Sequence, residues 1–196
     1  MEEQQQPQWA NTLPWAVMSV AVLTACVGTV YAKLVPASTT PLLVGILLAC
    51  SLPQLLGGVI LLRRNEILVG TLSGLFGTVI TLGAAITLWQ QLGAAQPGAI
   101  TGEVMGVFWI VLFVIAEVIA IGLGRASWFI MAGIAEVGLS FLFLGINSLS
   151  PSNSVAHIAG YLLIVFSAFC LYASSAMVLG ENFQRPVLPL GKPVFK

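Results

Sequence analysis

The stretch WFIMAGIAEVGLSFLFLGINSL, Trp128–Leu149, has the composition of a membrane-crossing helix, and Glu136 is its one ionisable side chain. A helix needs about 20 residues to cross a hydrocarbon core roughly 30 Å thick. Runs of similar length and character recur along the chain at Trp15–Tyr31, Pro41–Leu62, Ile67–Leu88, Ile100–Gly122 and Val155–Leu179. The sequence therefore predicts an integral, multi-pass membrane protein, an all-α bundle of six transmembrane helices.

Composition limits what else the chain can be. Charged residues make up 7% of it, against about a quarter in soluble domains. The apolar runs fill residues 15–180, which we take as the transmembrane domain, between a polar N-terminal segment (1–14) and a tail (181–196). The net charge is zero, so nucleic acid is not an expected partner. A lone histidine, no metal-ligand cluster and no nucleophile–base pair predict no enzyme activity, no metal and no cofactor.

The cations predict the orientation. An even number of spans places both termini on one side of the membrane. If that side is the cytoplasm, Lys33 alone faces outward, while the cytoplasmic cations are Arg63, Arg64, Arg125, Arg185, Lys192 and Lys196. An excess of Lys and Arg in cytoplasmic loops is the positive-inside pattern. We therefore expect both termini in the cytoplasm, and the protein in the inner or plasma membrane.

Two carboxyl groups, those of Glu117 and Glu136, lie well inside apolar runs, where an ionised carboxylate costs about 2.5 kcal/mol or more. They lie about eight residues before and about eleven residues after the turn at Arg125, so a rise of 1.5 Å per residue puts them at similar depth on antiparallel helices. Two interpretations stay open. Either each is protonated and structural, or the pair shares a proton and is a proton-sensitive element beside a permeation path.

The last quarter of the chain carries recognisable motifs. His157-Ile-Ala-Gly-Tyr161 opens the last apolar run, and Glu181-Asn-Phe-Gln-Arg-Pro-Val-Leu-Pro-Leu-Gly191 follows it. Gln54 and Gly58 form a Q-x-x-x-G pattern in the second run. These segments resemble the succinate–acetate permease (SatP/YaaH) family of acetate transporters, with H-x-A-G-W/Y at the start of the last helix and E-x-F-G-R-x-V-L-P-x-G after it. The resemblance spans the whole chain and is specific in its last quarter.

The resemblance implies a homohexamer with one narrow pore per subunit. Members pass acetate and related small monocarboxylates, with succinate in some, and uptake is commonly linked to protons. The family's hydrophobic constriction is formed by Phe, Tyr and Leu, which align with Val20, Phe76 and Ala135 here. Its N-terminal signature N-P-A-P-L-G-L is reduced to Asn11 and Pro14. The residues expected at the pore entrance or lining are Asn11, Pro14, Gln54 and His157.

Departures from the family pattern put the solute in question more than the fold. Two constriction residues have become smaller, and Glu117 and Glu136 have no family counterpart. Ionised carboxylates at the throat would oppose an anion, so an acetate path requires that the pair be neutral or off the pore. The first alternative is a channel for small neutral amides such as urea, because acid-gated urea channels are also six-helix hexamers with pore-facing Glu residues. The second is a membrane scaffold subunit without transport activity.

Overall fold

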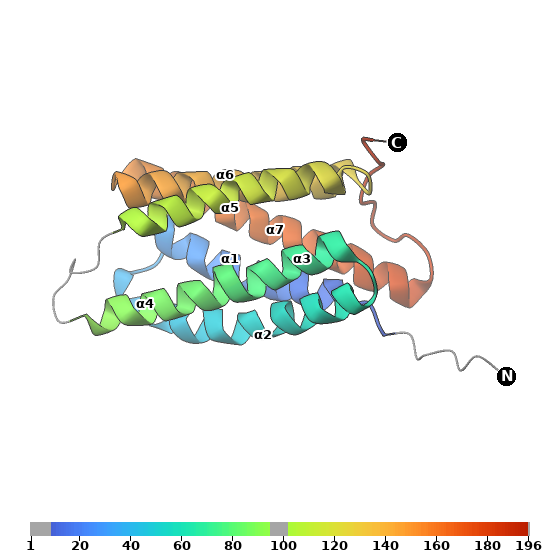
Figure 1. Ribbon diagram of the computed structural model, residues 1–196, viewed down its shortest axis with the longest axis horizontal. Coiled ribbons are helices and arrows are strands. Elements are labelled where there is room, and N and C mark those ends of the chain that lie inside the picture. Colours follow the sequence, from blue (N-terminus) through green and yellow to red (C-terminus); the bar gives the residue numbers. More distant parts are fainter. Residues whose placement is uncertain (1–8, 95–101, 196) are drawn as a thin grey trace.

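A computed structural model describes residues 9–94 and 102–195, and within these ranges it is helical, with no β-strand. Most of the predicted N-terminal segment, part of the Gln90–Gly98 loop, the start of the run at Ile100, and Lys196 lie outside the described residues. The helices are α1 (Leu13–Tyr31), α2 (Leu42–Arg63), α3 (Ile67–Leu75), η2 (Phe76–Leu82), α4 (Gly83–Gly93), α5 (Glu103–Leu123), α6 (Trp128–Leu149) and α7 (Asn153–Phe183), with a 3₁₀ turn, η1 (Ala37–Thr39), before α2 (Figure 1).

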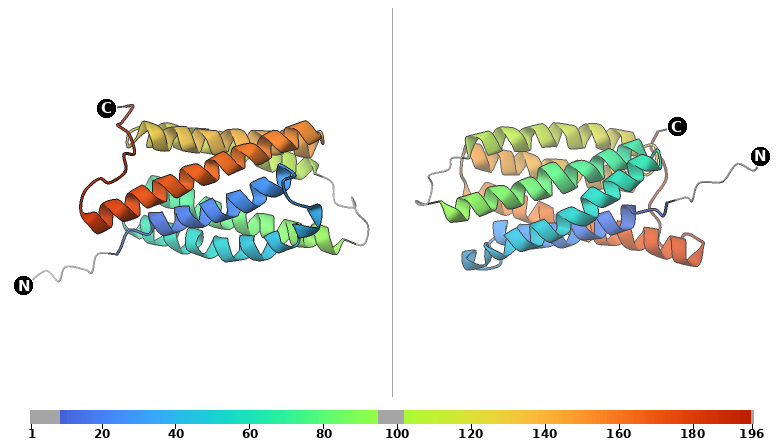
Figure 2. Two further views of the ribbon diagram at one scale, coloured as in Figure 1. Left: turned by 180° about the vertical axis from the view of Figure 1, so that it is seen from behind. Right: turned by 60° about the horizontal axis from the view of Figure 1, so that its bottom comes forward.

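Six helical spans in the described part of the chain are long and apolar enough to cross a membrane, which confirms the predicted six-helix fold. The segments α3, η2 and α4 form one of them, Ile67–Gly93. The last helix runs to Phe183, beyond the predicted end at Leu179. Its 31 residues span about 46 Å at 1.5 Å per residue, and its end projects past the neighbouring helices (Figure 2).

The spans form a closed ring. Contacts run from α1 to α7, α6, α5 and α3, then through α2 back to α1. The chain enters α1 and leaves α7 at the same end of the bundle (Figure 1). One cluster of buried apolar side chains fills the middle of the ring, including Val20, Phe76, Leu112, Val137 and Phe166. The core therefore joins the first span to the last as well as spans that follow one another in the chain.

Small residues bring α1 and α7 together. A Cβ atom built on Gly28 would come within 2.8 Å of the carbonyl oxygen of Gly160. About two turns away along the same two helices, the Ser167 hydroxyl donates a hydrogen bond to the Ala21 carbonyl at 2.7 Å. Glycine faces permit such close approach in membrane bundles, where packing and hydrogen bonds replace the hydrophobic driving force.

The third span is not a uniform α-helix, because η2 is π-helical. A π-helix bonds residue i to residue i+5 and occurs as short segments, often at functional sites. The segment packs against α2 near Pro53, where a Cβ built on Gly77 would lie 3.0 Å from the Cβ of Gln54. This change of helix type was not predicted from the sequence.

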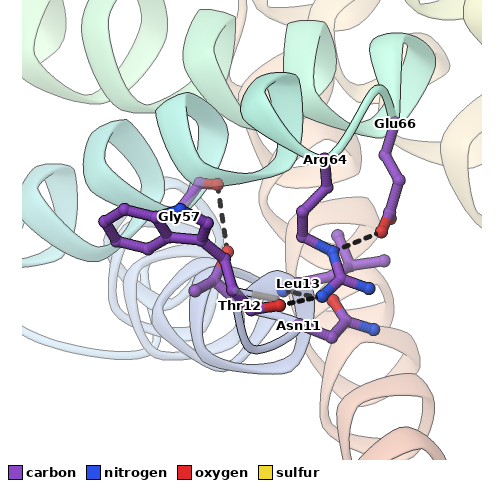
Figure 3. Close-up of polar contacts among 7 residues, drawn as sticks. Asn11, Thr12, Leu13, Gly57, Arg64 and Glu66 are labelled. Atoms are coloured by element: carbon purple, nitrogen blue, oxygen red, sulfur yellow. Dashed lines mark hydrogen bonds and ion pairs between the residues drawn. The ribbon is translucent and has the colours of Figure 1, made fainter. Parts of the chain in front are cut away.

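Polar contacts organise the end of the bundle where α1 begins (Figure 3). Arg64 pairs with Glu66 at 2.7 Å and also donates to the Trp9 carbonyl. Beside them, the Thr12 hydroxyl donates to the Gly57 carbonyl at 3.0 Å. The α2–α3 corner thereby holds the segment that leads into α1.

The tail folds back over the turn between α5 and α6. The amide of Trp128 donates to the Lys192 carbonyl at 2.9 Å, and the amide of Val194 donates to the Gly124 carbonyl at 2.8 Å. Gly191 adopts φ +84° against the Trp128 indole, a backbone conformation that favours glycine. These contacts hold the tail at the end of the bundle where α7 finishes.

Candidate permeation path

In the described part of the chain, two cavities of more than 100 Å³ lie inside the ring. The distal cavity, of about 340 Å³, is at the end away from the start of α1, and the proximal cavity, of about 190 Å³, is at the end where α1 starts. The distal cavity is lined near its outer end by Tyr31, Thr40, Gln91 and Ser148. The proximal cavity is lined near its outer end by Leu13, Ala126, Met177 and Leu190. Each cavity thus reaches inward from a different end of the bundle.

Phe76 lines both cavities, and we call its position between them the waist. Its side chain is 7% exposed, and its ring lies 6.0 Å from that of Phe141 and 6.4 Å from that of Phe166. Phe141 lines the distal cavity and Phe166 the proximal one. An aromatic cluster therefore lies between the two cavities.

Aromatic rings continue along the passage in both directions. On the distal side Trp109 stacks on Phe141 with ring centroids 5.5 Å apart. On the proximal side Phe169 stacks on Phe166 at 5.6 Å. Apolar rings offer no replacement for a solute's water shell, so this side of the passage suits a small, weakly hydrated solute.

Polar groups occupy another side of the waist. Gln54 lines the proximal cavity, and its Oε1 accepts a hydrogen bond from the Thr81 hydroxyl at 3.1 Å. Thr81 lines the distal cavity. The Gln54 Nε2 donates to the Cys50 carbonyl at 2.7 Å, and the Ser73 hydroxyl donates to the Gln54 carbonyl at 2.8 Å. Because both atoms of the amide are engaged, the orientation of the Gln54 side chain is set by its neighbours.

The described residues that line the two cavities include no Asp, Glu, Lys or Arg. Their polar members are hydroxyl, amide, indole and thiol groups, among them Thr81, Gln91, Trp109 and Cys170. Such a lining provides neutral hydrogen-bonding groups without a fixed charge. The lining of both cavities therefore contains no charged ring of the kind that selects ions in many channels.

The structure brings together Val20, Phe76 and Gln54 among the residues predicted for the path. Val20 and Gln54 line the proximal cavity beside Phe76. Ala135 packs against the same core cluster but lines neither cavity, whereas Ile134 lines the proximal cavity and Val137 the distal one. The face of α6 that meets the passage is thus rotated away from the aligned position.

The predicted entrance residues lie at the edges of the bundle. The exposed Asn11 accepts a hydrogen bond from the Leu13 amide at 3.0 Å, which satisfies one free donor at the start of α1. Pro14 lies in the first turn of α1, where its missing N–H costs nothing. His157 lies near the start of α7, and its Nε2 is buried with no hydrogen-bond partner within residues 9–94 and 102–195. None of the three lines either cavity.

Glu117 and Glu136 lie beside the passage and line neither cavity. Both oxygens of Glu136 and Oε1 of Glu117 are buried without a hydrogen-bond partner among the described residues, so the two carboxyl groups do not bond to each other. The Glu117 carboxyl lies against Gly138 on α6, and Glu136 is within electrostatic reach of Cys170 on α7. The pair therefore satisfies the requirement that an acetate path keep these groups out of its lining.

Several lining residues were missed by the sequence analysis, notably Thr81, Trp109 and Phe141. A lone threonine or aromatic residue in an apolar run carries no signal that distinguishes a path from ordinary packing. The one sequence signal for Thr81 was its position five residues after Phe76 in the same span. That spacing indicates a shared helix face only if the segment is known to be π-helical.

Comparison with known proteins agrees with this architecture. The sequence profile of the GPR1/FUN34/yaaH family matches residues 1–191. A solved structure described as that of the bacterial acetate channel SatP superposes with a TM-score of 0.81 at 21% sequence identity, covering 93% of this chain and 99% of that one. No curated protein sequence matches the chain.

The fold defines a multi-pass membrane protein whose six spans form a single bundle with two internal cavities. Within that class, the chain belongs to the GPR1/FUN34/yaaH family. The family suggested by the C-terminal motifs is thereby confirmed.

Proposed function

We propose that this protein is a membrane channel or transporter for small monocarboxylates such as acetate, with succinate as a further solute. The observation that carries the proposal is the meeting of two cavities, one from each end of the bundle, at Phe76. The uncharged lining is compatible with the passage of small solute molecules one at a time. The fold shared with the bacterial acetate channel SatP and the family membership support the choice of solute.

The assembly and orientation belong to the same proposal. We place both termini in the cytoplasm because all cations except Lys33 are then on that side. We also propose a homohexamer with one path in each subunit, as the family resemblance implies. Because the ring of helices encloses both cavities within one chain, no partner subunit has to complete the path.

Proton linkage is assigned to Glu117 and Glu136. Both oxygens of Glu136 and Oε1 of Glu117 are buried with no hydrogen-bond partner in the described part of the chain, and their helices, α6 and α5, pack against each other. A change in their protonation would alter the packing of α5 and α6 around the passage without placing charge in its lining. This arrangement supports a proton-sensitive element that is separate from the solute path.

A neutral amide such as urea is the second candidate solute. The observation in its favour is the lack of cationic side chains in the described lining, since such groups would have attracted a carboxylate. The amide of Gln54 and the hydroxyl of Thr81 can exchange hydrogen bonds with an amide as well as with a carboxyl group.

Uptake by purified protein in proteoliposomes tests the proposal. Radiolabelled acetate and urea are compared between about pH 5 and pH 8, with protein-free liposomes as the control for leakage through lipid. Acetate uptake well above this control, with slower urea uptake, is the expected result. Faster urea uptake would favour the second candidate. If neither solute enters faster than in protein-free liposomes while the assembly stays intact, the scaffold interpretation replaces both.

A further inference from the structure

The π-helical segment has a direct consequence for the waist. Phe76 and Thr81 are five residues apart on η2. In an α-helix, at 3.6 residues per turn, positions five apart point about 140° away from each other. In a π-helix the backbone bonds join i to i+5, so these positions stack on the same side. The change of helix type therefore puts Thr81 on the same side of the helix as Phe76, and both residues line the distal cavity.

Thr81 does not bond to its own helix through this hydroxyl. Its donor reaches across to Gln54 Oε1 on α2, and both side chains are fully buried. The other nearby hydroxyls are used by backbone carbonyls: Thr24 donates to Val20 at 2.8 Å and Ser73 to Gln54 at 2.8 Å. The bond from Thr81 is thus the side-chain-to-side-chain polar contact at the waist, and it links a residue of the distal cavity to one of the proximal cavity.

A carboxyl group that crosses the waist must find partners there. Burying a polar group without a hydrogen bond costs several kcal/mol, and the aromatic rings of Phe76, Phe141 and Phe166 supply none. The Thr81 hydroxyl can turn its donor from Gln54 to a solute oxygen, and its own oxygen can accept from the O–H of a protonated acid. The alkyl end of the solute meanwhile lies against Phe76.

We propose that Thr81, paired with Gln54, is the specificity-determining residue of the waist and binds the carboxyl group of a small monocarboxylic acid as it passes Phe76. The inference rests on the proposed function. It adds a residue and an exchange of hydrogen bonds that the aligned constriction residues do not include.

The test compares acetate uptake by the full chain in proteoliposomes. Thr81→Val removes the hydroxyl with little change in shape, and Thr81→Ser retains it. The matched control is Thr78→Val on the same π-helical segment, because the Thr78 hydroxyl donates to the Gly74 carbonyl at 2.7 Å and lines neither cavity. Gln54→Met removes the partner amide at similar length.

We expect Thr81→Val to lower acetate uptake at least about tenfold, the effect of one lost hydrogen bond in the passage. Thr81→Ser should stay within about threefold of the wild type, and Thr78→Val within about twofold. Gln54→Met should also lower uptake, because the hydroxyl then lacks the partner that orients it. Size-exclusion chromatography and thermal unfolding in detergent report whether each variant is folded.

If the wild type takes up acetate and Thr81→Val takes it up equally fast, the inference is overturned and the proposed function stands. No uptake by the wild type overturns the proposed function itself. If Thr81→Val does not fold, Thr81→Cys takes its place. Its thiol is a weak donor, so uptake should fall clearly below that of Thr81→Ser, and equal uptake by these two variants would overturn the inference.

Discussion

Gly28 on α1 and Gly160 on α7 lie in backbone contact: a Cβ atom added to Gly28 would stand 2.8 Å from the Gly160 carbonyl oxygen and 3.1 Å from the Ile164 amide nitrogen. The contact is between main chains, so no side-chain rotation can relieve a clash there. It fixes the distance between the two helices that lead the chain into and out of the ring.

Gly28→Ala should therefore destabilise the bundle. Overpacking of this kind costs about 1–3 kcal/mol, and a lowered midpoint of thermal unfolding in detergent would report it. Gly45→Ala on α2 is the matched control, because its added Cβ meets no described atom within 4 Å apart from its chain neighbours and the nearby backbone of its own helix. The control should be neutral or slightly stabilising, since alanine favours a helix interior over glycine. Equal midpoints for the two variants would contradict the close packing of α1 on α7.

Phe76→Leu should weaken the separation between the two cavities. Loss of the ring removes its contacts with Phe141 and Phe166 and widens the waist. Acetate uptake is expected to rise by about threefold or more, and the preference for acetate over longer monocarboxylates should decrease. Phe143→Leu is the control, because Phe143 packs against the core but lines neither cavity. An unchanged preference in Phe76→Leu would show that the waist is elsewhere.

Glu117→Gln and Glu136→Gln address proton linkage. Because neither residue lines a cavity, the maximal acetate uptake of the double variant should stay within about twofold of the wild type. Its dependence on pH, between about pH 5 and pH 8, should be flatter, because two titrating carboxyl groups beside the path have been removed. Cys170→Ser controls for the thiol near Glu136. An identical pH profile in the double variant would make both glutamates structural.

Gln184→Gly should stabilise the end of α7. Gln184 follows the helix with φ +53°, in the left-handed region that costs a residue with a side chain about 1 kcal/mol relative to glycine. The family pattern E-x-F-G-R carries glycine at this position. A gain of up to about 1 kcal/mol is expected, reduced by loss of the exposed hydrogen bond from the Gln184 amide to the Glu181 carbonyl. Gln184→Ala, which keeps a Cβ, should not gain, and thermal unfolding compares the two.

Gly191→Val should release the tail from the bundle. The positive φ of Gly191 and its contact with Trp128 leave no room for a branched side chain. The amides of Trp128 and Val194, which bond across this contact, should then exchange hydrogen for deuterium faster. Amides in the middle of α6 provide the internal reference and should be unaffected. Unchanged exchange at Trp128 would show that Gly191 does not hold the tail in place.

Much of the fold was predictable because the bilayer imposes a length and an apolar composition on each span. The run at Trp128–Leu149 coincides with α6, and the predicted start of the third run, Ile67, is the start of α3. The α7 boundary was less accurate, since its last turn includes the polar Glu181 and Asn182, which hydropathy assigns to the tail.

The candidate path was predictable only in part. Phe76, Gln54 and Val20 were found through the family pattern, and all three line the proximal cavity. The same alignment selected Ala135, although Ile134 and Val137 are the neighbours on α6 that reach the cavities. One residue along a helix turns the side chain by about 100°, and alignment across a divergent stretch does not determine that rotation.

The linear order of residues was enough to establish a six-span membrane protein. Charged side chains are costly to bury in hydrocarbon, so runs of about 20 residues that almost lack them are typical of membrane-spanning helices. It also placed Glu117 and Glu136 at similar depth, through the constant rise of the helix. Folding in three dimensions settled which side chains face one another: it set a π-helical turn that carries Thr81 to Gln54, and it left both glutamates beside the passage. These outcomes depend on helix rotation and packing, which arise from contacts between segments far apart in the chain.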